Sequence, residues 1–477
     1  MVSLCILFLC TRLPGILALP LFNDEAVYLY RAQQFPAQFL FTIHDGKLIH
    51  ELILAALARL PWDPLLTGRF LSIVCGGLTV VGLWLSGKMI GHSLAGAFAG
   101  FLYILSPLAI VHDRLAIPDA MLGSVASLLL AATLRLTTLP HANRWHAAGA
   151  GALVALATLV KLPGLFLFAL PALVILTQVE APGGNSQRWT LLRTALIVTL
   201  LAPAAFAPFN YGGAESHKIG VPNVMLRVMQ VLDNARQIGE WAAVTMPLPA
   251  LLLAGAGMSI PGKRRLALIL IAAACLFCSA LVVIGSVLYP RYLLAALPLV
   301  LFTAGLGLSH LLRLTGTARY LGIMLLVTTS AWGSSLIIQY ARNPADTPLP
   351  AVDQRQYIKG WSAGYNLPHV YDTLRTIAAE QGGITVISPI HERVVHTGPK
   401  IYLKNDPFIS FIDIDFRDVH ARVLVHDIAA QRPVFVLLDA EEVAAFDVER
   451  RFPELKRVGE WRNPYSSMAF YLYAWSP

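Results

Sequence analysis

The sequence predicts a multi-spanning α-helical membrane protein, with about 11 transmembrane helices and a C-terminal soluble α/β domain. Hydrophobic residues make up 56% of the 477 residues and charged residues only 13%, which is far from the composition of soluble proteins. Long apolar runs recur as far as about residue 340. Acidic residues then become frequent, because 17 of the 28 Asp and Glu residues lie in the last 135 positions.

Eleven apolar runs approach the roughly 20 residues needed to cross the hydrocarbon core. In the run 147–179, Lys161-Leu162-Pro163-Gly164 places a charge and a helix breaker near the middle. We interpret this run as two helices joined by a hairpin whose tip lies on the acidic side. The eleven runs are 3–21, 66–87, 92–111, 119–138, 147–162, 163–179, 190–208, 243–260, 266–289, 293–312 and 320–340.

The charge distribution predicts which loops share a face. With eleven spans, the short basic loops lie together, and the positive-inside rule makes their face cytoplasmic. Ten of the eleven acidic residues before residue 343 then lie on the outer face, with Glu180 as the exception. We also expect the first run to be an uncleaved span with a cytoplasmic N-terminus, because it has no basic leader and no clear cleavage site. A natural start upstream stays open.

Two outer loops, 22–65 and 209–242, are too long to be simple connectors. In the first, Asn23 is a candidate cap for a helix that opens with Asp24-Glu25. A second helix is expected over 47–60, and its largely apolar surface predicts a place in the membrane interface.

The C-terminal domain, 343–477, follows a linker that contains three prolines within seven residues. Its short β-rich runs alternate with helical patterns, which predicts a small α/β unit separate from the membrane domain, 1–342. With a cytoplasmic N-terminus and eleven spans, this unit is expected on the outer face of the membrane. The expected strands are 384–388, 434–438 and 469–473, and the expected helix is 370–381.

Asp24 and Glu25 are the strongest candidates for chemistry. Two carboxylates at a membrane boundary are costly to place, and they suit a general base, a cation site or a helix start. The loop 112–119 is the densest in charge. It contains Asp113, Arg114 and Asp119, which are either functional groups or a solvated hairpin tip, and Asp119 also suits the dipole at a helix start.

Lys47 and Arg291 stand next to apolar segments on the predicted outer face. Each either snorkels to the lipid surface or binds a phosphate, and the forked guanidinium of Arg291 favours a phosphate. His44, Asp45 and His50 near Lys47 suggest a divalent cation, but their spacing is not diagnostic, and a loop histidine is more often solvated.

Five short motifs, in this order and on one predicted face, resemble the GT-C fold glycosyltransferases. The closest group is glycosyltransferase family 39, which contains the protein O-mannosyltransferases and the bacterial transferases that add aminoarabinose to lipid A. The resemblance covers roughly residues 1–340. The motifs are Asn23-Asp24-Glu25-Ala26-Val27-Tyr28, Asp45-Gly46-Lys47, Arg114-Leu115-Ala116-Ile117-Pro118-Asp119, Thr158-Leu159-Val160-Lys161-Leu162-Pro163-Gly164 and Pro290-Arg291-Tyr292-Leu293-Leu294.

The resemblance implies a GT-C type domain in a bacterial inner (plasma) membrane, with the C-terminal domain periplasmic or extracellular. It implies an inverting hexosyl- or pentosyltransferase that moves a monosaccharide from a polyprenyl-phosphate donor to an acceptor hydroxyl on a lipid, glycan or protein. Nucleic acid is not an expected partner. The implied roles are Asp24 as base, Glu25 as its helper, Lys47, Arg114 and Arg291 on phosphate, Asp113 and Asp119 on sugar hydroxyls, and Lys161 and Tyr292 in substrate binding.

The chain departs from the family pattern at Gly46-Lys47-Leu48-Ile49, where the aminoarabinose branch has an acid followed by Lys-Pro-Pro. The role of that acid, including any metal contact, is not carried over, so no cofactor is assigned and a divalent metal stays an alternative. Trp361 and Tyr365, near the end of the membrane domain, suit an interfacial anchor more than a sugar platform. A flippase for a lipid-linked saccharide and a non-catalytic assembly subunit remain alternatives.

Overall fold

The computed structural model describes residues 1–476 except 38–45, 140–142, 179–183 and 207–223. It divides into two compact units. The first comprises Met1–Ala18, Pro36–Ile53 and Leu66–Pro350, and the second comprises Leu19–Phe35, Leu54–Leu65 and Ala351–Pro477. Two segments of the predicted outer loop 22–65 therefore belong to the same unit as the C-terminal domain.

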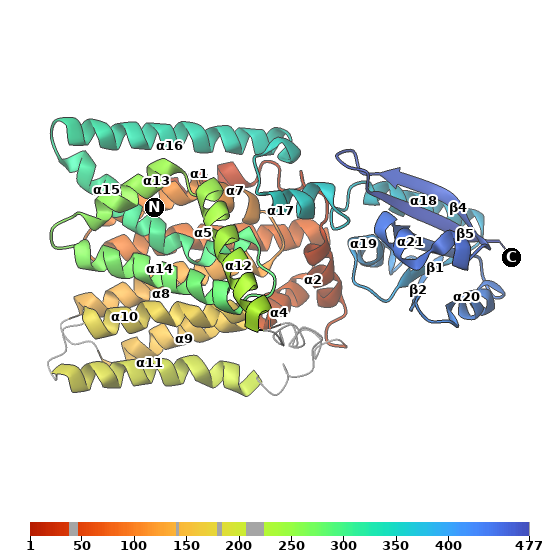
Figure 1. The fold of residues 1–477 in the computed structure, drawn as a ribbon, viewed down its shortest axis with the longest axis horizontal. Helices are drawn as coiled ribbons and strands as arrows, with labels where there is room; N and C mark the ends of the chain where they lie inside the picture. Colours follow the sequence, from red (N-terminus) through yellow and green to blue (C-terminus); the bar gives the residue numbers. More distant parts are fainter. Residues whose placement is uncertain (38–45, 140–142, 179–183, 207–223, 477) are drawn as a thin grey trace. The chain divides into compact units, whose positions relative to one another are not determined.

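The first unit is a bundle of helices, many of which lie roughly side by side in Figure 1. Each of the eleven predicted runs contains a helix. The sharpest local difference is that α1 ends at Arg12, because Pro14 and Gly15, the latter with φ of 73°, turn the chain. The helices are α1 (Val2–Arg12), α4 (Leu48–Leu57), α5 (Pro64–Met89), α6 (Ser93–Ile104), α7 (Pro107–His112), α8 (Pro118–Thr138), α9 (Arg144–Val160), η1 (Leu162–Phe168), α10 (Ala169–Thr177), α11 (Gly184–Phe206), α12 (Val224–Thr245), α13 (Leu248–Met258), α14 (Arg264–Ile284), η4 (Pro290–Ala295), α15 (Leu297–Arg313) and α16 (Thr317–Arg342). The end of α4, from Leu54, and the first two residues of α5 are assigned to the second unit.

Four described helices, α5, α8, α14 and α16, are long and apolar enough to cross a membrane. The number becomes five if α12 and α13, which meet at a bend of 99°, form one broken span. The other apolar helices are shorter, so the count of eleven spans stays a prediction. Prolines account for several breaks, since Pro107 is the first residue of α7 and Pro163 the second residue of η1, where the sequence is still apolar.

The second unit contains a five-stranded sheet of order β2-β1-β3-β5-β4. Strands β1, β2 and β3 are parallel, while β5 runs antiparallel to both β3 and β4. The three predicted strands are confirmed as β1, β3 and β5, and the predicted helix is α18. The elements are α2 (Asn23–Gln33), η5 (Pro344–Asp346, in the first unit), α17 (Ala351–Gln354), η6 (Arg355–Lys359), α18 (Leu367–Glu380), β1 (Ile384–Pro389), α19 (Val394–Leu403), β2 (Ile409–Ile414), α20 (Ala421–Ala429), β3 (Val434–Asp439), α21 (Ala440–Phe446), α22 (Val448–Arg451), β4 (Leu455–Arg462) and β5 (Ala469–Trp475).

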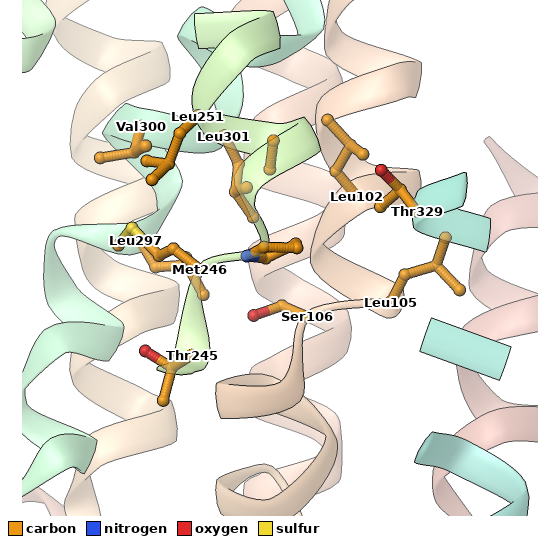
Figure 2. Close-up of a pocket in the computed structure, with 12 residues that line it drawn as sticks. Leu102, Leu105, Ser106, Thr245, Met246, Leu251, Leu297, Val300, Leu301 and Thr329 are labelled. Atoms are coloured by element: carbon orange, nitrogen blue, oxygen red, sulfur yellow. The ribbon is translucent and has the colours of Figure 1, made fainter. Parts of the chain in front are cut away.

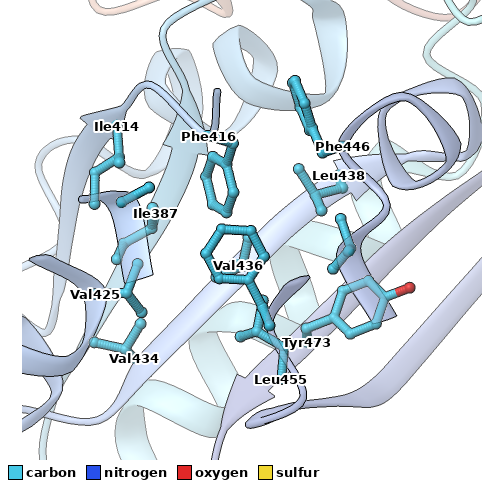
Figure 3. Close-up of a cluster of buried hydrophobic side chains, with 13 residues drawn as sticks. Ile387, Ile414, Phe416, Val425, Val434, Val436, Leu438, Phe446, Leu455 and Tyr473 are labelled. Atoms are coloured by element: carbon cyan, nitrogen blue, oxygen red, sulfur yellow. The ribbon is translucent and has the colours of Figure 1, made fainter. Parts of the chain in front are cut away.

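The core of this sheet is built from the apolar side chains that alternate along its central strands. Val436 and Leu438 of β3 lie among Ile387 of β1, Tyr473 of β5 and Val425 of α20, all of which are buried (Figure 3). Strands β1 and β3 are buried along their whole length, as expected for central parallel strands. The sequence analysis missed β2 and β4 because both are edge strands with many exposed or half-buried residues.

Candidate active site

An ion cluster of the first unit gathers residues from loops that are far apart in the sequence. The carboxylate of Asp119 accepts a hydrogen bond from the Lys161 ammonium at 2.6 Å and lies 3.6 Å from Arg291 Nε. All three side chains are buried, with at most 10% of any side chain exposed. The contact places the break at Lys161 beside the start of α8, which carries Asp119.

Helix breaks place Lys161 in this cluster. Helix α9 ends at Val160, and Lys161 takes an extended backbone conformation because Pro163 cannot continue the helix. Gly164 is required next, since a Cβ at this position would lie 2.2 Å from the backbone of Ala157. The interpretation of 147–179 as two helical segments with a break at this motif is therefore confirmed.

Short turns orient the partners of Lys161. Pro118 starts α8, which leaves Asp119 in the first turn, where the helix dipole favours a carboxylate. Pro290 starts η4 and presents Arg291 and Tyr292 together. The Lys161 ammonium lies 3.8 Å from the centre of the Tyr292 ring, a cation–π contact that a buried amine stabilises well.

Helix α4 carries His50, and Lys47 directly precedes the helix. The charges of Asp119, Lys47 and Lys161 all act on His50. His50 is buried, so the expectation of a solvated loop histidine is wrong for this residue. Burial lowers the pKa of His50 to about 3, Asp119 opposes the shift, and the two lysines add to it, so the imidazole is neutral at pH 7.

The charge balance of the cluster favours an anion. Two cations contact the carboxylate of Asp119, and the charge of Lys47 acts on Lys161 and His50. Among these five described residues, three carry positive charge and two carry negative charge, namely Asp119 and the buried Glu51, one turn after Lys47. An excess of buried cations is the usual preparation for a phosphate or another anion.

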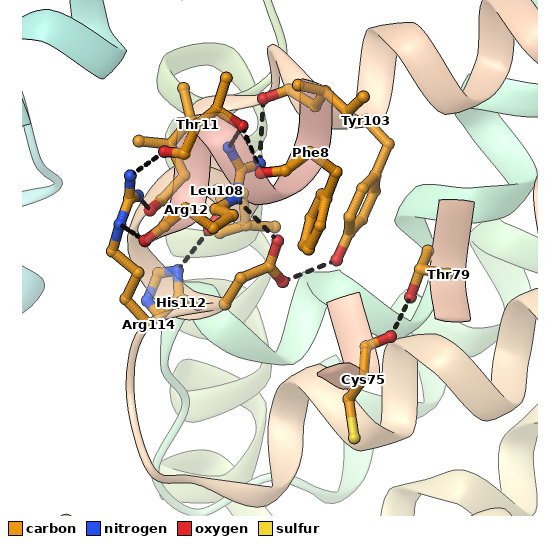
Figure 4. A network of polar contacts seen from close by, with 12 residues as sticks. Phe8, Thr11, Arg12, Cys75, Thr79, Tyr103, Leu108, His112 and Arg114 are labelled. Atoms are coloured by element: carbon orange, nitrogen blue, oxygen red, sulfur yellow. Dashed lines mark hydrogen bonds and ion pairs between the residues drawn. The ribbon is translucent and has the colours of Figure 1, made fainter. Parts of the chain in front are cut away.

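Asp113 and Arg114 belong to a different buried network, which also contains Arg12 and Tyr103 (Figure 4). Asp113 accepts hydrogen bonds from Arg12 Nε at 3.1 Å and from the Tyr103 hydroxyl at 2.8 Å. Arg114 is fully buried and donates to backbone carbonyl oxygens, including that of Arg12 at 2.9 Å. Its guanidinium also lies over the Tyr340 ring.

These contacts give Asp113 and Arg114 structural partners, and their predicted roles on sugar and phosphate draw no support from them. The sequence analysis missed Arg12, which was assigned to the interior of an apolar span. A charged residue within such a run was the available signal, because buried charges in membrane proteins are paired.

Asp24 and Glu25 belong to the second unit, at the start of α2. The Glu25 carboxylate is buried and accepts a hydrogen bond from the Phe22 amide at 3.2 Å, which caps the helix. Asp24 is half-buried. The expectation that Asn23 caps the helix is wrong, because Phe22 holds the cap position and Asn23 is already helical.

A metal site draws no support from the described part of the chain, where no three His, Cys, Asp or Glu side chains form a possible ligand group. His44 and Asp45 lie outside the described residues. Trp361 and Tyr365 both have partners within the second unit: the Arg393 guanidinium lies over the Trp361 ring, and Tyr365 packs edge-on against Tyr465.

A separate apolar pocket lies where two helices are broken (Figure 2). Its walls include Leu105 and Ser106 between α6 and α7, and Met246 between α12 and α13. The polar side chains that line it are hydroxyl groups, and none of the lining residues is ionisable. The pocket is therefore suited to apolar groups and not to acid–base chemistry.

Comparison with known proteins gives one family match. The model of the family described as Dolichyl-phosphate-mannose-protein mannosyltransferase matches residues 47–208, about a third of the chain. This segment contains Lys47, Asp119 and Lys161. Among curated proteins, none matches the sequence.

Solved structures resemble the whole chain. The crystal structure of ArnT from Cupriavidus metallidurans bound to undecaprenyl phosphate matches with a TM-score of 0.62 and 14% identity, covering 99% of this chain and 97% of that chain. The crystal structure of its apo state matches with a TM-score of 0.59 and 15% identity, covering 98% of this chain and 97% of that chain. The crystal structure of the Archaeoglobus fulgidus oligosaccharyltransferase in complex with Zn and sulfate matches with a TM-score of 0.51 and 13% identity. That match covers 98% of this chain and 73% of that chain. At such low identity the likeness establishes the fold: this chain has the GT-C fold, and it resembles the glycosyltransferases of family 39.

Proposed function

We propose that this protein is an inverting glycosyltransferase that moves a monosaccharide from a polyprenyl-phosphate donor to an acceptor hydroxyl. The observation that carries the proposal is the buried cluster of Lys161, Arg291 and Asp119, in which positive charge is in excess. The GT-C fold and the family match over residues 47–208 support the same reaction class.

The cluster suits the departing phosphate. When the acceptor oxygen attacks C1 of the sugar, the bond between C1 and the phosphate oxygen breaks and its electron pair goes to the phosphate. Cations fixed in a site of low dielectric stabilise this developing charge without reorganising. Asp119 contacts both Lys161 and Arg291, so we assign it the role of orienting these two cations.

The acceptor hydroxyl must lose its proton during the attack, and a carboxylate is the appropriate base. The family resemblance suggests Asp24 or Glu25. Glu25 is buried and engaged in capping α2, whereas Asp24 is half-buried at the start of the same helix. We therefore assign the proton to Asp24 and a structural task to Glu25.

The proposed setting is a bacterial inner membrane, with a cytoplasmic N-terminus and the chemistry on the outer face. The donor is a lipid-linked hexose or pentose, and the acceptor is a lipid, glycan or protein. The ArnT structure bound to undecaprenyl phosphate supports a donor lipid of this class by analogy. Residues of the pocket that set sugar specificity are not assigned, because fold does not determine them.

The test measures sugar transfer from a polyprenyl-phosphate monosaccharide by the purified protein in lipid. Asp24→Asn should lower the rate by roughly 10²- to 10⁴-fold and leave donor binding unchanged. Arg291→Gln should lower the transfer rate and also weaken donor binding. Arg264→Gln, at the start of α14 in a predicted cytoplasmic loop, is the matched control and should change neither.

Two outcomes contradict the proposal. Full transfer by Asp24→Asn would exclude this residue as the base. Translocation of the lipid-linked sugar across the bilayer without any transfer would favour a flippase.

A further inference from the structure

Helix α2, which carries the proposed base, is built into the C-terminal α/β unit. Phe22 and Ala363 form an antiparallel bridge just before the helix. The Asn23 amide donates to the Ser362 carbonyl at 2.9 Å, and the Gly364 amide donates to the Leu21 carbonyl at 2.9 Å. The chain entering α2 is therefore fixed by backbone bonds to the segment that leads into α18.

A bidentate ion pair holds the other end of α2. Arg31 donates from Nη2 to Glu392 Oε2 at 2.6 Å and from Nε to Glu392 Oε1 at 3.2 Å. The Arg31 side chain is 6% exposed and that of Glu392 is 42% exposed. Two parallel bonds to one carboxylate fix orientation as well as distance. The pair therefore opposes rotation of α2 about its axis.

Glu392 stands in the short loop between β1 and α19, and the loop is itself anchored. The next residue, Arg393, donates to Asp439 at the end of β3 over 2.6 Å. Arg393 also lies over the Trp361 ring. In the first turn of α19, the His396 ring contacts the Glu442 carboxylate at 3.0 Å.

Burying the Asp439 carboxylate next to Glu442 is electrostatically unfavourable, and the positive charge of Arg393 offsets this cost. Asp439 is fully buried at the start of α21, and burial followed by the charge of Glu442 raises its pKa, while Arg393 opposes that shift. A guanidinium at this position therefore keeps the loop next to β3. The loop therefore contacts the sheet through Arg393 and contacts α2 through Glu392.

The position of α2 is informative. In open α/β sheets, ligands usually bind beyond the carboxyl ends of the parallel strands. Here residues at those ends contact α2: Glu392 follows β1, and Lys400 of α19, which pairs with Asp413 of β2, lies over the Tyr30 ring. The helix takes the place that a ligand holds in other sheets of this kind.

We propose that the loop between β1 and α19 is a positioning device for the transfer reaction, with Glu392 and Arg31 as positioning residues that orient α2 and thereby the Asp24 carboxylate. This inference rests on the proposed function of Asp24. The C-terminal unit then serves the chemistry by holding the base and does not act as a separate sugar-binding module.

The experiment compares Glu392→Gln, Glu392→Arg and the exchanged pair Arg31→Glu/Glu392→Arg with the full-length protein in lipid. Hydrogen exchange of residues 23–33 and the kcat and KM for a polyprenyl-phosphate sugar are measured. Glu392→Gln and Glu392→Arg should speed exchange in α2 and lower kcat by about 10- to 100-fold, with the donor KM changed less than twofold. The exchanged pair should restore exchange protection and most of kcat.

Glu460→Gln is the matched control, because Glu460 pairs with Arg462 on the edge strand β4 of the same sheet. It should change neither measurement. Unchanged exchange in Glu392→Gln and Glu392→Arg overturns the inference, and so does an unchanged kcat in an active protein. If the wild-type protein transfers no sugar, the proposed function fails, and the exchange rates alone decide whether Glu392 holds α2.

Discussion

The two ends of the segment 113–119 differ in how they use a buried carboxylate. Asp113 is matched by Arg12 and Tyr103 within a network whose other donors end on protein oxygens. Asp119, six residues later, is shared by the two cations Lys161 and Arg291. In the first network the cations also donate to hydroxyl and backbone oxygens, whereas in the second two cations share one carboxylate.

The comparison teaches that burial and charge alone do not identify a functional site. Arg12 and Arg114 are as buried as Arg291. Their guanidinium groups bind hydroxyl, carbonyl and carboxylate oxygens of the protein, which is the pattern expected of groups that hold helices together. The partners of the cations distinguish the two clusters: Arg12 and Arg114 also donate to hydroxyl and backbone oxygens of the protein, whereas Lys161 and Arg291 share the carboxylate of Asp119. The substitutions below test that difference.

The largest expected effect is on folding. Asp113→Leu removes the carboxylate that pairs with Arg12 and leaves a buried charge uncompensated, so the free energy of unfolding should fall by about 3–5 kcal/mol. Equilibrium unfolding in lipid or detergent measures the change. The double variant Arg12→Met/Asp113→Leu should recover most of the loss together with transfer activity. A double variant that folds but has no activity would contradict a purely structural role.

The next effect is on catalysis. Arg291→Ala should lower kcat/KM for transfer by about 10²- to 10³-fold, because it removes one preorganised cation from the departing phosphate. In contrast to the Asp113 network, the apolar double variant Lys161→Met/Asp119→Leu should fold and stay inactive. Recovery of transfer in that double variant would remove the functional distinction between the two clusters.

A smaller loss of stability should follow Tyr103→Phe. The Tyr103 hydroxyl donates to the Asp113 carboxylate at 2.8 Å in a buried setting. Hydrogen bonds to charged groups contribute about 1.5–3 kcal/mol, so the free energy of unfolding should decrease by that amount. Donor binding, measured by titration with undecaprenyl phosphate, should stay within twofold of wild type. A large change in donor binding would place Asp113 in the substrate site.

The smallest expected effect concerns Tyr292. Its ring faces the Lys161 ammonium, and a buried cation–π contact contributes about 0.5–2 kcal/mol. Tyr292→Leu should therefore lower kcat/KM by about 3- to 30-fold, while Tyr292→Phe, which keeps the ring, should stay close to wild type. Equal losses in both variants would assign the effect to the hydroxyl group instead.

The sequence predicted the local structure where a chemical rule acts over a few residues. Pro118 and Pro163 mark helix starts that the structure contains, and the central strands β1 and β3 follow their β-branched runs. The order of motifs also indicated the GT-C fold. The edge strands β2 and β4 escaped notice because their partly exposed residues carry a weaker hydrophobic pattern.

Composition and spacing by themselves determined the class of the protein, its helix breaks and the kinds of residue available for chemistry. Only the tertiary structure decided how the buried charges pair. Arg12 joins Asp113 across 101 residues, and Lys161 joins Asp119 across 42. No local preference specifies such partners, because the electrostatic energy of a buried charge depends on distances that packing sets.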